Sequence, residues 1–334
     1  MPGVRKRGEE IREFILENIT DNRNTAALTA ERFSISLPAV YKHIDRLVSN
    51  KQLIKKAGLF VLKSIKYKYT YLINKTLRED TVWEKDIKKH FSGLPVNVWN
   101  IWVYGFMEMF NNAIDHSKGK KINVIIEENK LFTSVFIYDD GIGIFKNIMK
   151  SFDLFDEKDA LLELAKGKRT TDNTRHSGQG IFFTSRVFDD FLITSNGINY
   201  NVNQNKNVQI LNNKIKYSTM VYLRLAKNSN KILKNVFDQF STEIPGDFDK
   251  TIIPVTLANS SDLVSRSQAR RILSGLELFK DVTLDFNNVD YIGQAFADEI
   301  FRVFKNMYYN TIITAINTNN DTLNMINRAL NTKL

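Results

Sequence analysis

Glu108 and Asn112 are a pair of residues whose types and spacing could do chemistry. They lie four residues apart in an apolar segment that begins at Val98, so a helix over this segment places them on one face, one turn apart. Two polar groups on the buried side of an apolar helix are costly unless they have partners or a function. The pair therefore indicates a site at which a carboxylate and an amide meet a ligand.

Two glycine-containing segments follow this helix. Asp139-Asp140-Gly141-Ile142-Gly143 ends the second of two predicted strands, 122–127 and 132–138. Gly178-Gln179-Gly180 opens a predicted helix that runs through Val187, and Thr219 lies in a later predicted strand, 217–225. Each segment alone is typical of a tight turn, so the inference depends on their order and spacing.

The four segments together resemble the GHKL ATPase family, which includes gyrase, sensor kinases and anti-sigma kinases, over roughly residues 67–230. The resemblance implies a Bergerat-type α/β sandwich that binds ATP with Mg²⁺. It implies that Asn112 is the Mg²⁺ ligand, because an amide oxygen suits a hard cation. It also implies that Asp139 accepts a hydrogen bond from the adenine amino group, with Thr219 in support.

The same resemblance gives the glycines a role at the nucleotide. Gly141 and Gly143 would let the backbone approach the nucleotide without a Cβ. Gly178 and Gly180 would do so at the phosphates, where the start of the next helix offers free N–H groups. The stretch between these pairs would be the ATP lid. Its basic residues are candidates for phosphate contact, as is His116, although a solvated loop is an equal alternative: Lys166, Lys168, Arg169 and Arg175.

Glu108 bears on the type of reaction. In the family, a Glu four residues before the Asn is found in ATPases and anti-sigma kinases, where it polarises the attacking water or hydroxyl group. His90 begins a His-x-x-x-x-Pro segment, but it lacks the usual acidic neighbour and lies only 22 residues before Asn112. A histidine autokinase is therefore not expected. A degenerate nucleotide-binding scaffold is a third alternative, disfavoured by the intact motifs.

Residues 1–66 are predicted to form a separate domain. Apolar residues at helical spacing predict a helix over 8–19, a second helix fits 25–33, and Ser36 with Pro38 is typical of the start of a third. Two apolar segments joined by Lys55-Lys56-Ala57-Gly58 predict a β-hairpin. This order resembles the winged helix-turn-helix family, whose third helix enters the major groove of DNA.

The winged-helix resemblance implies a DNA-binding surface on the third helix and the hairpin, formed by Tyr41, Lys42, Arg46, Lys55 and Lys56. The distribution of charge favours an anionic partner for this part of the chain. Residues 1–70 carry a net charge of +7, residues 71–239 carry +5 and residues 240–334 carry −2. A small protein–protein module with solvated lysines is the alternative.

Residues 240–334 alternate predicted strands and helices, which is typical of a small α/β domain. The stretch 282–299 resembles STAS-like domains, the fold of anti-sigma factor antagonists, and more closely a STAS-like family of uncharacterised type. The turn 290–295 lacks the Ser or Thr that such antagonists phosphorylate, so we expect an interaction or sensing module. The preceding helix, with Ser265, Ser267, Arg266, Arg270 and Arg271, is expected to be a capped, solvated helix start, with a docking face as the alternative.

The amino-acid composition excludes several other classes of protein and of site. The 334 residues include no cysteine, which excludes disulfide scaffolds, thiolate nucleophiles and Cys-based zinc sites. The charged N-terminal segment argues against a secretory signal, and the apolar stretch 98–110 is too short and too polar to span a membrane. A cytoplasmic protein without a membrane partner is therefore expected.

The sequence thus predicts a multidomain α+β protein with three parts: a winged helix-turn-helix at 1–66, a GHKL ATPase domain at 67–235 and a STAS-like domain at 240–334. The expected function is that of an ATP-responsive transcriptional regulator that binds double-stranded DNA and hydrolyses ATP slowly with Mg²⁺. A protein partner through the STAS-like domain and a homodimer are further expectations. The alternative function is an anti-sigma-type protein serine/threonine kinase.

Overall fold

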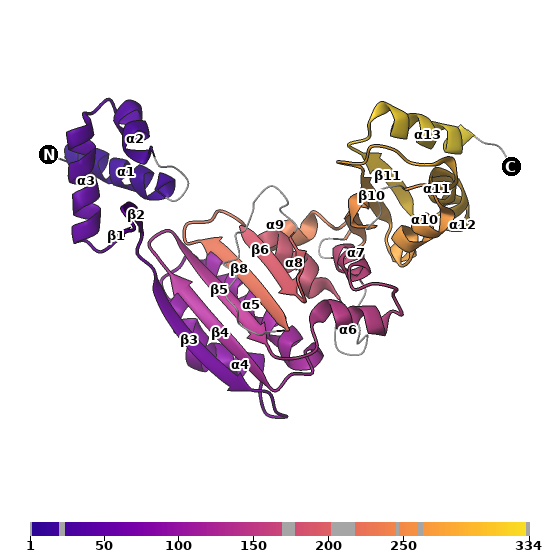
Figure 1. The fold of residues 1–334 in the computed structure, drawn as a ribbon, viewed down its shortest axis with the longest axis horizontal. Coiled ribbons are helices and arrows are strands. Elements are labelled where there is room, and N and C mark those ends of the chain that lie inside the picture. Colours follow the sequence, from indigo (N-terminus) through magenta and orange to yellow (C-terminus); the bar gives the residue numbers. More distant parts are fainter. Residues whose placement is uncertain are drawn as a thin grey trace.

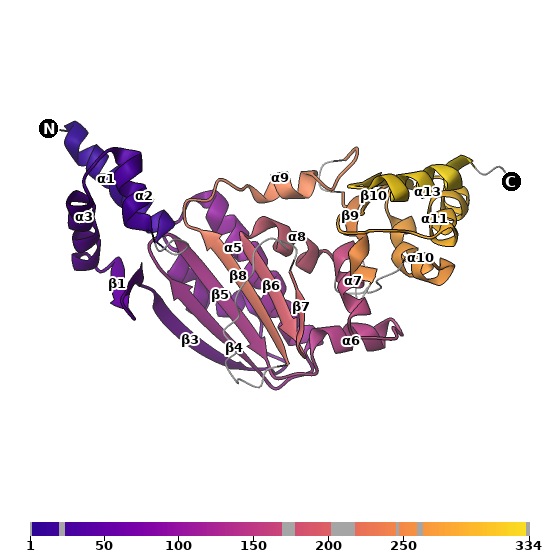
Figure 2. The same ribbon diagram turned by 45° about the horizontal axis from the view of Figure 1, so that its top comes forward.

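The computed structural model describes residues 2–19, 24–168, 178–201, 218–244, 247–258 and 263–331. They form a helical N-terminal part, a central part built on a large sheet, and a C-terminal domain with its own sheet (Figure 1). The N-terminal part and the C-terminal domain lie at opposite ends of the central sheet in both views (Figure 2). No helix among the described residues is both long and apolar enough to cross a membrane.

The N-terminal part has the predicted order of three helices and a hairpin. Its elements are α1 (Pro2–Asn18), α2 (Thr25–Phe33), α3 (Leu37–Ser49), β1 (Leu53–Lys56) and β2 (Leu59–Leu62). One apolar side of each helix forms a small core that includes Ile15, Val40, Ile44 and Leu47. Ser36 stands at the start of α3, as expected, but its side chain makes no capping hydrogen bond.

Among the described residues, the central sheet has six strands, all paired antiparallel. Their order is β3-β4-β5-β8-β6-β7. The strands are β3 (Ile65–Leu72), β4 (Lys121–Glu128), β5 (Phe132–Asp139), β6 (Asp190–Ser195), β7 (Ile198–Tyr200) and β8 (Thr219–Ala226). The predicted strands at 122–127, 132–138 and 217–225 are confirmed as β4, β5 and β8, whereas β3 was not predicted.

The long helix α5 (Val96–His116) packs against one face of this sheet. Its buried residues, such as Ile101, Trp102 and Phe106, pack against every second residue of the strands, and together they form one apolar core. The remaining helices of the central part are α4 (Glu79–Val82), α6 (Ile144–Ser151), α7 (Asp159–Lys166), α8 (Gln179–Val187) and α9 (Leu233–Asp238). After α4 the chain continues through a π-helical turn (Trp83–Ile87) and a 3-10 turn (Lys88–Phe91).

The C-terminal domain has a parallel three-stranded sheet in the order β11-β10-β9. Its strands are β9 (Lys250–Pro254), β10 (Asp281–Asp285) and β11 (Ile312–Ile316). Its helices are α10 (Arg266–Leu273), α11 (Gln294–Asp298), α12 (Lys305–Met307) and α13 (Asn320–Asn331), with a π-helical turn at Glu299–Phe304 and 3-10 turns at Val255–Ala258 and Leu276–Leu278. The predicted alternation of strands and helices is confirmed.

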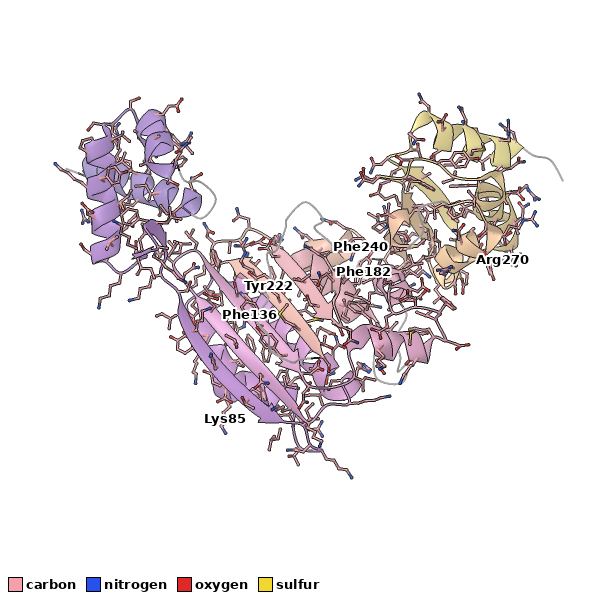
Figure 3. All side chains as sticks on the ribbon, in the orientation of Figure 1. Lys85, Phe136, Phe182, Tyr222, Phe240 and Arg270 are labelled. Carbon is pink, nitrogen blue, oxygen red and sulfur yellow. The ribbon has the colours of Figure 1, made fainter. Side chains whose placement is uncertain are left out.

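Aromatic residues join the C-terminal domain to the central part. Phe182 of α8 lies 4.8 Å from Phe240 and 4.6 Å from Phe248, measured between ring centroids. Figure 3 labels Phe182 and Phe240 at this junction. Phe182, Phe183 and Leu162 of the central part belong to the same buried cluster as the core of the C-terminal domain. Between α9 and β9, Pro245 and Gly246 lie outside the described residues.

Candidate functional site

A cavity of about 300 Å³ lies between α5, the central sheet and the first turn of α8. Elements far apart in the sequence contribute to its wall, among them α6 and α7. Six of the residues predicted to bind or act on a nucleotide line it together: Glu108, Asn112, Asp139, Gly178, Gly180 and Thr219. The structure therefore brings the helix pair, the end of β5 and the start of α8 to one place.

Glu108 and Asn112 lie on the side of α5 that faces this cavity, and both are half-buried. Within the part of the chain that the structure describes, the side-chain amide of Asn112 has no hydrogen-bond partner. An amide on the cavity wall without a protein partner leaves its oxygen and its NH₂ group available to a ligand.

The first turn of α8 approaches α5 at Glu108. A Cβ on residue 180 would lie 2.0 Å from Oε2 of Glu108, so a larger residue here would displace the carboxylate of Glu108. Gly178 stands just before α8 with a φ of +75°, a left-handed conformation that glycine adopts without strain. The free N–H groups at the start of α8 consequently border the cavity, where an anionic group would be stabilised.

Asp139 ends β5 and is paired in register with Thr219, the first residue of β8. Only 6% of Asp139 is exposed. Burial raises the pKa of Asp139 to about 6, although the Gly141 N–H and the Thr219 hydroxyl group donate hydrogen bonds that favour its charged form. Thr219 in turn accepts a hydrogen bond from the Ile144 N–H at 3.1 Å. Asp139 is thus a buried acceptor held in a defined position.

Gly141 and Gly143 do not line the cavity, although the sequence suggested that they approach the nucleotide. A Cβ on residue 141 would lie 1.9 Å from the carbonyl oxygen of Ser117. Gly143 has a φ of +90°, and a Cβ there would lie 2.7 Å from Oγ of Ser195. These two glycines let the chain turn closely past its neighbours after β5.

Asn147 is a cavity residue that the sequence analysis missed. It lies on α6, is 6% exposed and lines the cavity with Ile144 and Ile148. Its amide side chain has no hydrogen-bond partner in the described part of the chain. The available signal was its position four residues after Gly143, which is one helical turn beyond the glycine segment.

The lysines suggested for phosphate contact have other partners. Nζ of Lys166 donates to Glu163 at 2.8 Å and to the carbonyl oxygens of Arg271 and Ser274, at 3.0 and 2.8 Å, in the C-terminal domain. Nζ of Lys168 donates to the Leu278 carbonyl oxygen at 2.7 Å. His116 does line the cavity. Arg169 and Arg175 lie outside the described residues.

His90 occupies a structural position. Its Nε2 lies 2.7 Å from the Tyr69 hydroxyl group and its Nδ1 lies 2.9 Å from Oε1 of Glu128. The side chain is 6% exposed. A histidine with both ring nitrogens engaged and almost no exposed surface is a poor phosphoacceptor, which agrees with the sequence-based expectation.

The residues suggested for DNA binding lie on the N-terminal part, away from the cavity. The side chains on α3 and the hairpin are all exposed: Tyr41, Lys42, Arg46, Lys55 and Lys56. Ala57 and Gly58 at the tip of the hairpin both have positive φ angles, 49° and 82°, as a tight two-residue turn requires. Burial, together with Arg12 and Arg46, lowers the pKa of His43 on the same helix.

Two comparisons with known proteins bear on these parts. Residues 268–323 match the family model described as "STAS-like domain of unknown function (DUF4325)". The chain is also similar to the sensor histidine kinase YbdK of Bacillus subtilis (strain 168), with 25% identity over 206 residues. That alignment covers 53% of this chain and 60% of the relative, so the chain spans less than two thirds of the relative's length. The C-terminal domain is STAS-like, as predicted.

Proposed function

We propose that this chain is a GHKL-type nucleotide-binding regulator whose central cavity binds ATP with Mg²⁺. One observation carries the proposal: Asn112 from a helix and Asp139 from a strand end line the same cavity with the start of α8. An acceptor for the base, an oxygen donor for a cation and free N–H groups for phosphates are the three parts such a site needs. The similarity to a sensor histidine kinase supports a kinase-like use of ATP.

The residues that line the cavity fit a Mg²⁺ ion that is bound partly by phosphates and water better than they fit a metal ion bound only by protein side chains. Among the described residues, no group of three His, Asp or Glu side chains could hold a metal ion. Mg²⁺ keeps several waters and is commonly bound through one or two protein oxygens plus substrate phosphates. Asn112 would supply the protein oxygen, and the cation would neutralise phosphate charge. Glu108, one helical turn away, would hold the proton of the attacking water or hydroxyl group.

Two variants test this assignment. Asn112→Ala should abolish Mg²⁺-dependent ATP binding measured by calorimetry, whereas Glu108→Ala should bind ATP and lose turnover. Both residues are half-buried on one face of α5, so each variant is a matched control for the structural effect of the other. Unchanged hydrolysis in Glu108→Ala would show that it is not the base. Equal ATP binding by Asn112→Ala and wild type would contradict the cation site.

Turnover and group transfer are separable outcomes. A slow ATPase releases free phosphate, whereas an anti-sigma-type protein serine/threonine kinase transfers the γ-phosphate to a protein. Incubation with γ-labelled ATP therefore distinguishes the two. The intact Glu108 is compatible with both, and the engaged, buried His90 disfavours histidine autophosphorylation.

For the N-terminal part we propose DNA binding controlled by the nucleotide. Leu131 and Phe132, at the start of β5, pack against the core of the N-terminal part. The other end of β5 is Asp139 in the cavity. One strand therefore connects the proposed base-binding residue to the proposed DNA-binding part. Equal affinity for duplex DNA with and without Mg²⁺-ATP, in the full chain, would contradict this coupling.

A further inference from the structure

Helix α7 contributes to two sites at once. Glu163 and Leu164 line the central cavity. Their neighbour Leu162 is 1% exposed and belongs to the buried cluster of the C-terminal domain. The helix is therefore both a wall of the proposed nucleotide site and a contact surface for the C-terminal domain, which lies beside it (Figure 1).

The C-terminal domain contacts both ends of α7 through α10. At the start of α7, Oδ1 of Asp159 accepts a hydrogen bond from Nη1 of Arg271 at 2.8 Å, and the Asp159 side chain is only 5% exposed. At the end of α7, Lys166 donates to the carbonyl oxygens of Arg271 and Ser274. These carbonyls end α10, where an ammonium group is favoured by the helix dipole.

The Lys166 contact also reaches the cavity. Lys166 and Glu163 form an ion pair whose side chains are 1% and 3% exposed, and Glu163 is a cavity residue. Breaking a buried pair leaves an uncompensated charge, which is strongly destabilising. The end of α10, Lys166 and the cavity wall at Glu163 should consequently hold their positions together.

We infer that the STAS-like domain positions α7 through Arg271 and the end of α10, and so sets the nucleotide affinity of the central cavity. The inference rests on the proposed nucleotide site. Arg271 is a positioning residue, since it acts through Asp159 and α7. Coupling between sites is reciprocal, so a nucleotide that contacts the α7 wall strengthens the α7–α10 contact to the same extent. The start of α10 is capped by Ser265, as expected, whereas Arg271 in its last turn makes a docking contact within the chain.

Arg271→Ala in the full-length protein tests the inference, with Arg270→Ala as the matched control. Arg270 is the preceding residue of the same helix, but it pairs with Glu299 at 2.6 Å inside the C-terminal domain (labelled in Figure 3). Arg271→Ala should weaken Mg²⁺-ATP affinity about 5- to 20-fold by calorimetry, within the usual range of coupling between sites. In hydrogen exchange without nucleotide, it should speed exchange across α7. Arg270→Ala should change neither quantity, and Arg271→Lys should restore part of the affinity.

The outcomes separate the two claims. Absence of ATP binding by the wild type would overturn the proposed function and this inference together. Wild-type binding with an unchanged affinity in Arg271→Ala would overturn the inference alone. Equal losses in Arg270→Ala and Arg271→Ala would overturn it too, because they would show a general destabilisation of the C-terminal domain. A KM that rises in Arg271→Ala with kcat unchanged is the kinetic result expected of a positioning residue.

Discussion

Gly180 of α8 lies directly against the side chain of Glu108 of α5: a Cβ on residue 180 would lie 2.0 Å from Oε2 of the glutamate. The absence of a side chain at Gly180 therefore leaves room for the carboxylate of Glu108 on another helix. The contact fixes the first turn of α8 against the carboxylate that we propose as the base. The contact explains how two segments that lie 72 residues apart in the sequence form one site.

Gly180→Ala should consequently impair the site through Glu108. The added methyl group must displace the carboxylate or α8, and overpacking of this kind costs about 1–3 kcal/mol of folding free energy. We expect a loss of stability in urea unfolding and a loss of ATP turnover. The double variant Glu108→Ala/Gly180→Ala removes the clash and should be about as stable as Glu108→Ala. If the stability losses of the two substitutions add instead, the contact between residue 180 and Glu108 is not the cause of the loss in Gly180→Ala.

Asp139 should make stability depend on pH in a defined direction. Its pKa is raised from 3.8 to about 6, so between these values the folded protein keeps a proton that the unfolded chain has lost. Its contribution is therefore most favourable below pH 4 and declines as the pH rises through about 6, by about 3 kcal/mol at 1.36 kcal/mol per pKa unit. Urea unfolding at pH 5 and pH 7.5 measures the upper part of this change, about 1.4 kcal/mol, because pH 5 lies about one unit below the folded-state pKa.

Asp139→Asn is the control for this pH dependence, because it removes the titrating group and keeps the shape of the side chain. The difference in stability between wild type and variant should grow in the variant's favour as the pH rises, since other titrating groups cancel. A constant difference across this range would show that the Asp139 pKa is not raised. The same comparison applied to ATP affinity should show a loss below about pH 6 in the wild type only, because a protonated Asp139 is a weaker acceptor for the adenine amino group.

The parts of this site that depend on local sequence pattern could be predicted from the sequence. The four-residue spacing of Glu108 and Asn112 and the strand ending at Asp139 follow from helix and strand periodicity, and the structure brings these side chains to one cavity. The strand β3 was not predicted, although Tyr67, Tyr69 and Tyr71 alternate along it and pack against the core.

Partners distant in sequence could not be predicted from local pattern. Lys166 was one of four basic candidates for phosphate contact, with a solvated loop as the equal alternative. Its actual acceptors include the Ser274 carbonyl oxygen, 108 residues further along the chain. Only the packing of α10 against α7 determines this contact. The roles of Gly141 and Gly143 were likewise set by tertiary neighbours, Ser117 and Ser195, that no local motif contains.

Asn147 should contribute to ligand binding at the expense of stability. A buried amide without a protein partner is unfavourable, and an apolar replacement of similar size is often neutral or stabilising. Asn147→Leu should therefore keep or raise the unfolding midpoint while it weakens ATP binding about 3- to 10-fold, the worth of one hydrogen bond. Asn123→Leu is the control, because Asn123 lies on β4 and accepts a hydrogen bond from Thr70 at 2.8 Å outside the cavity. Unchanged affinity in Asn147→Leu would show that the amide does not meet the nucleotide.

The basic hairpin should be detectable through salt dependence. Lys55 and Lys56 are exposed next to the tip of the β1–β2 turn. If they contact phosphates, Lys55→Ala/Lys56→Ala should weaken binding of the full chain to duplex DNA at low salt and reduce the slope of log affinity against log salt by about 2, one per released contact. Lys85→Ala removes an equally exposed lysine from the central part (Figure 3) and should leave the slope unchanged. An identical slope in the hairpin variant and the wild type would show that the hairpin does not touch the DNA backbone, and a protein partner would then be the better interpretation of this surface.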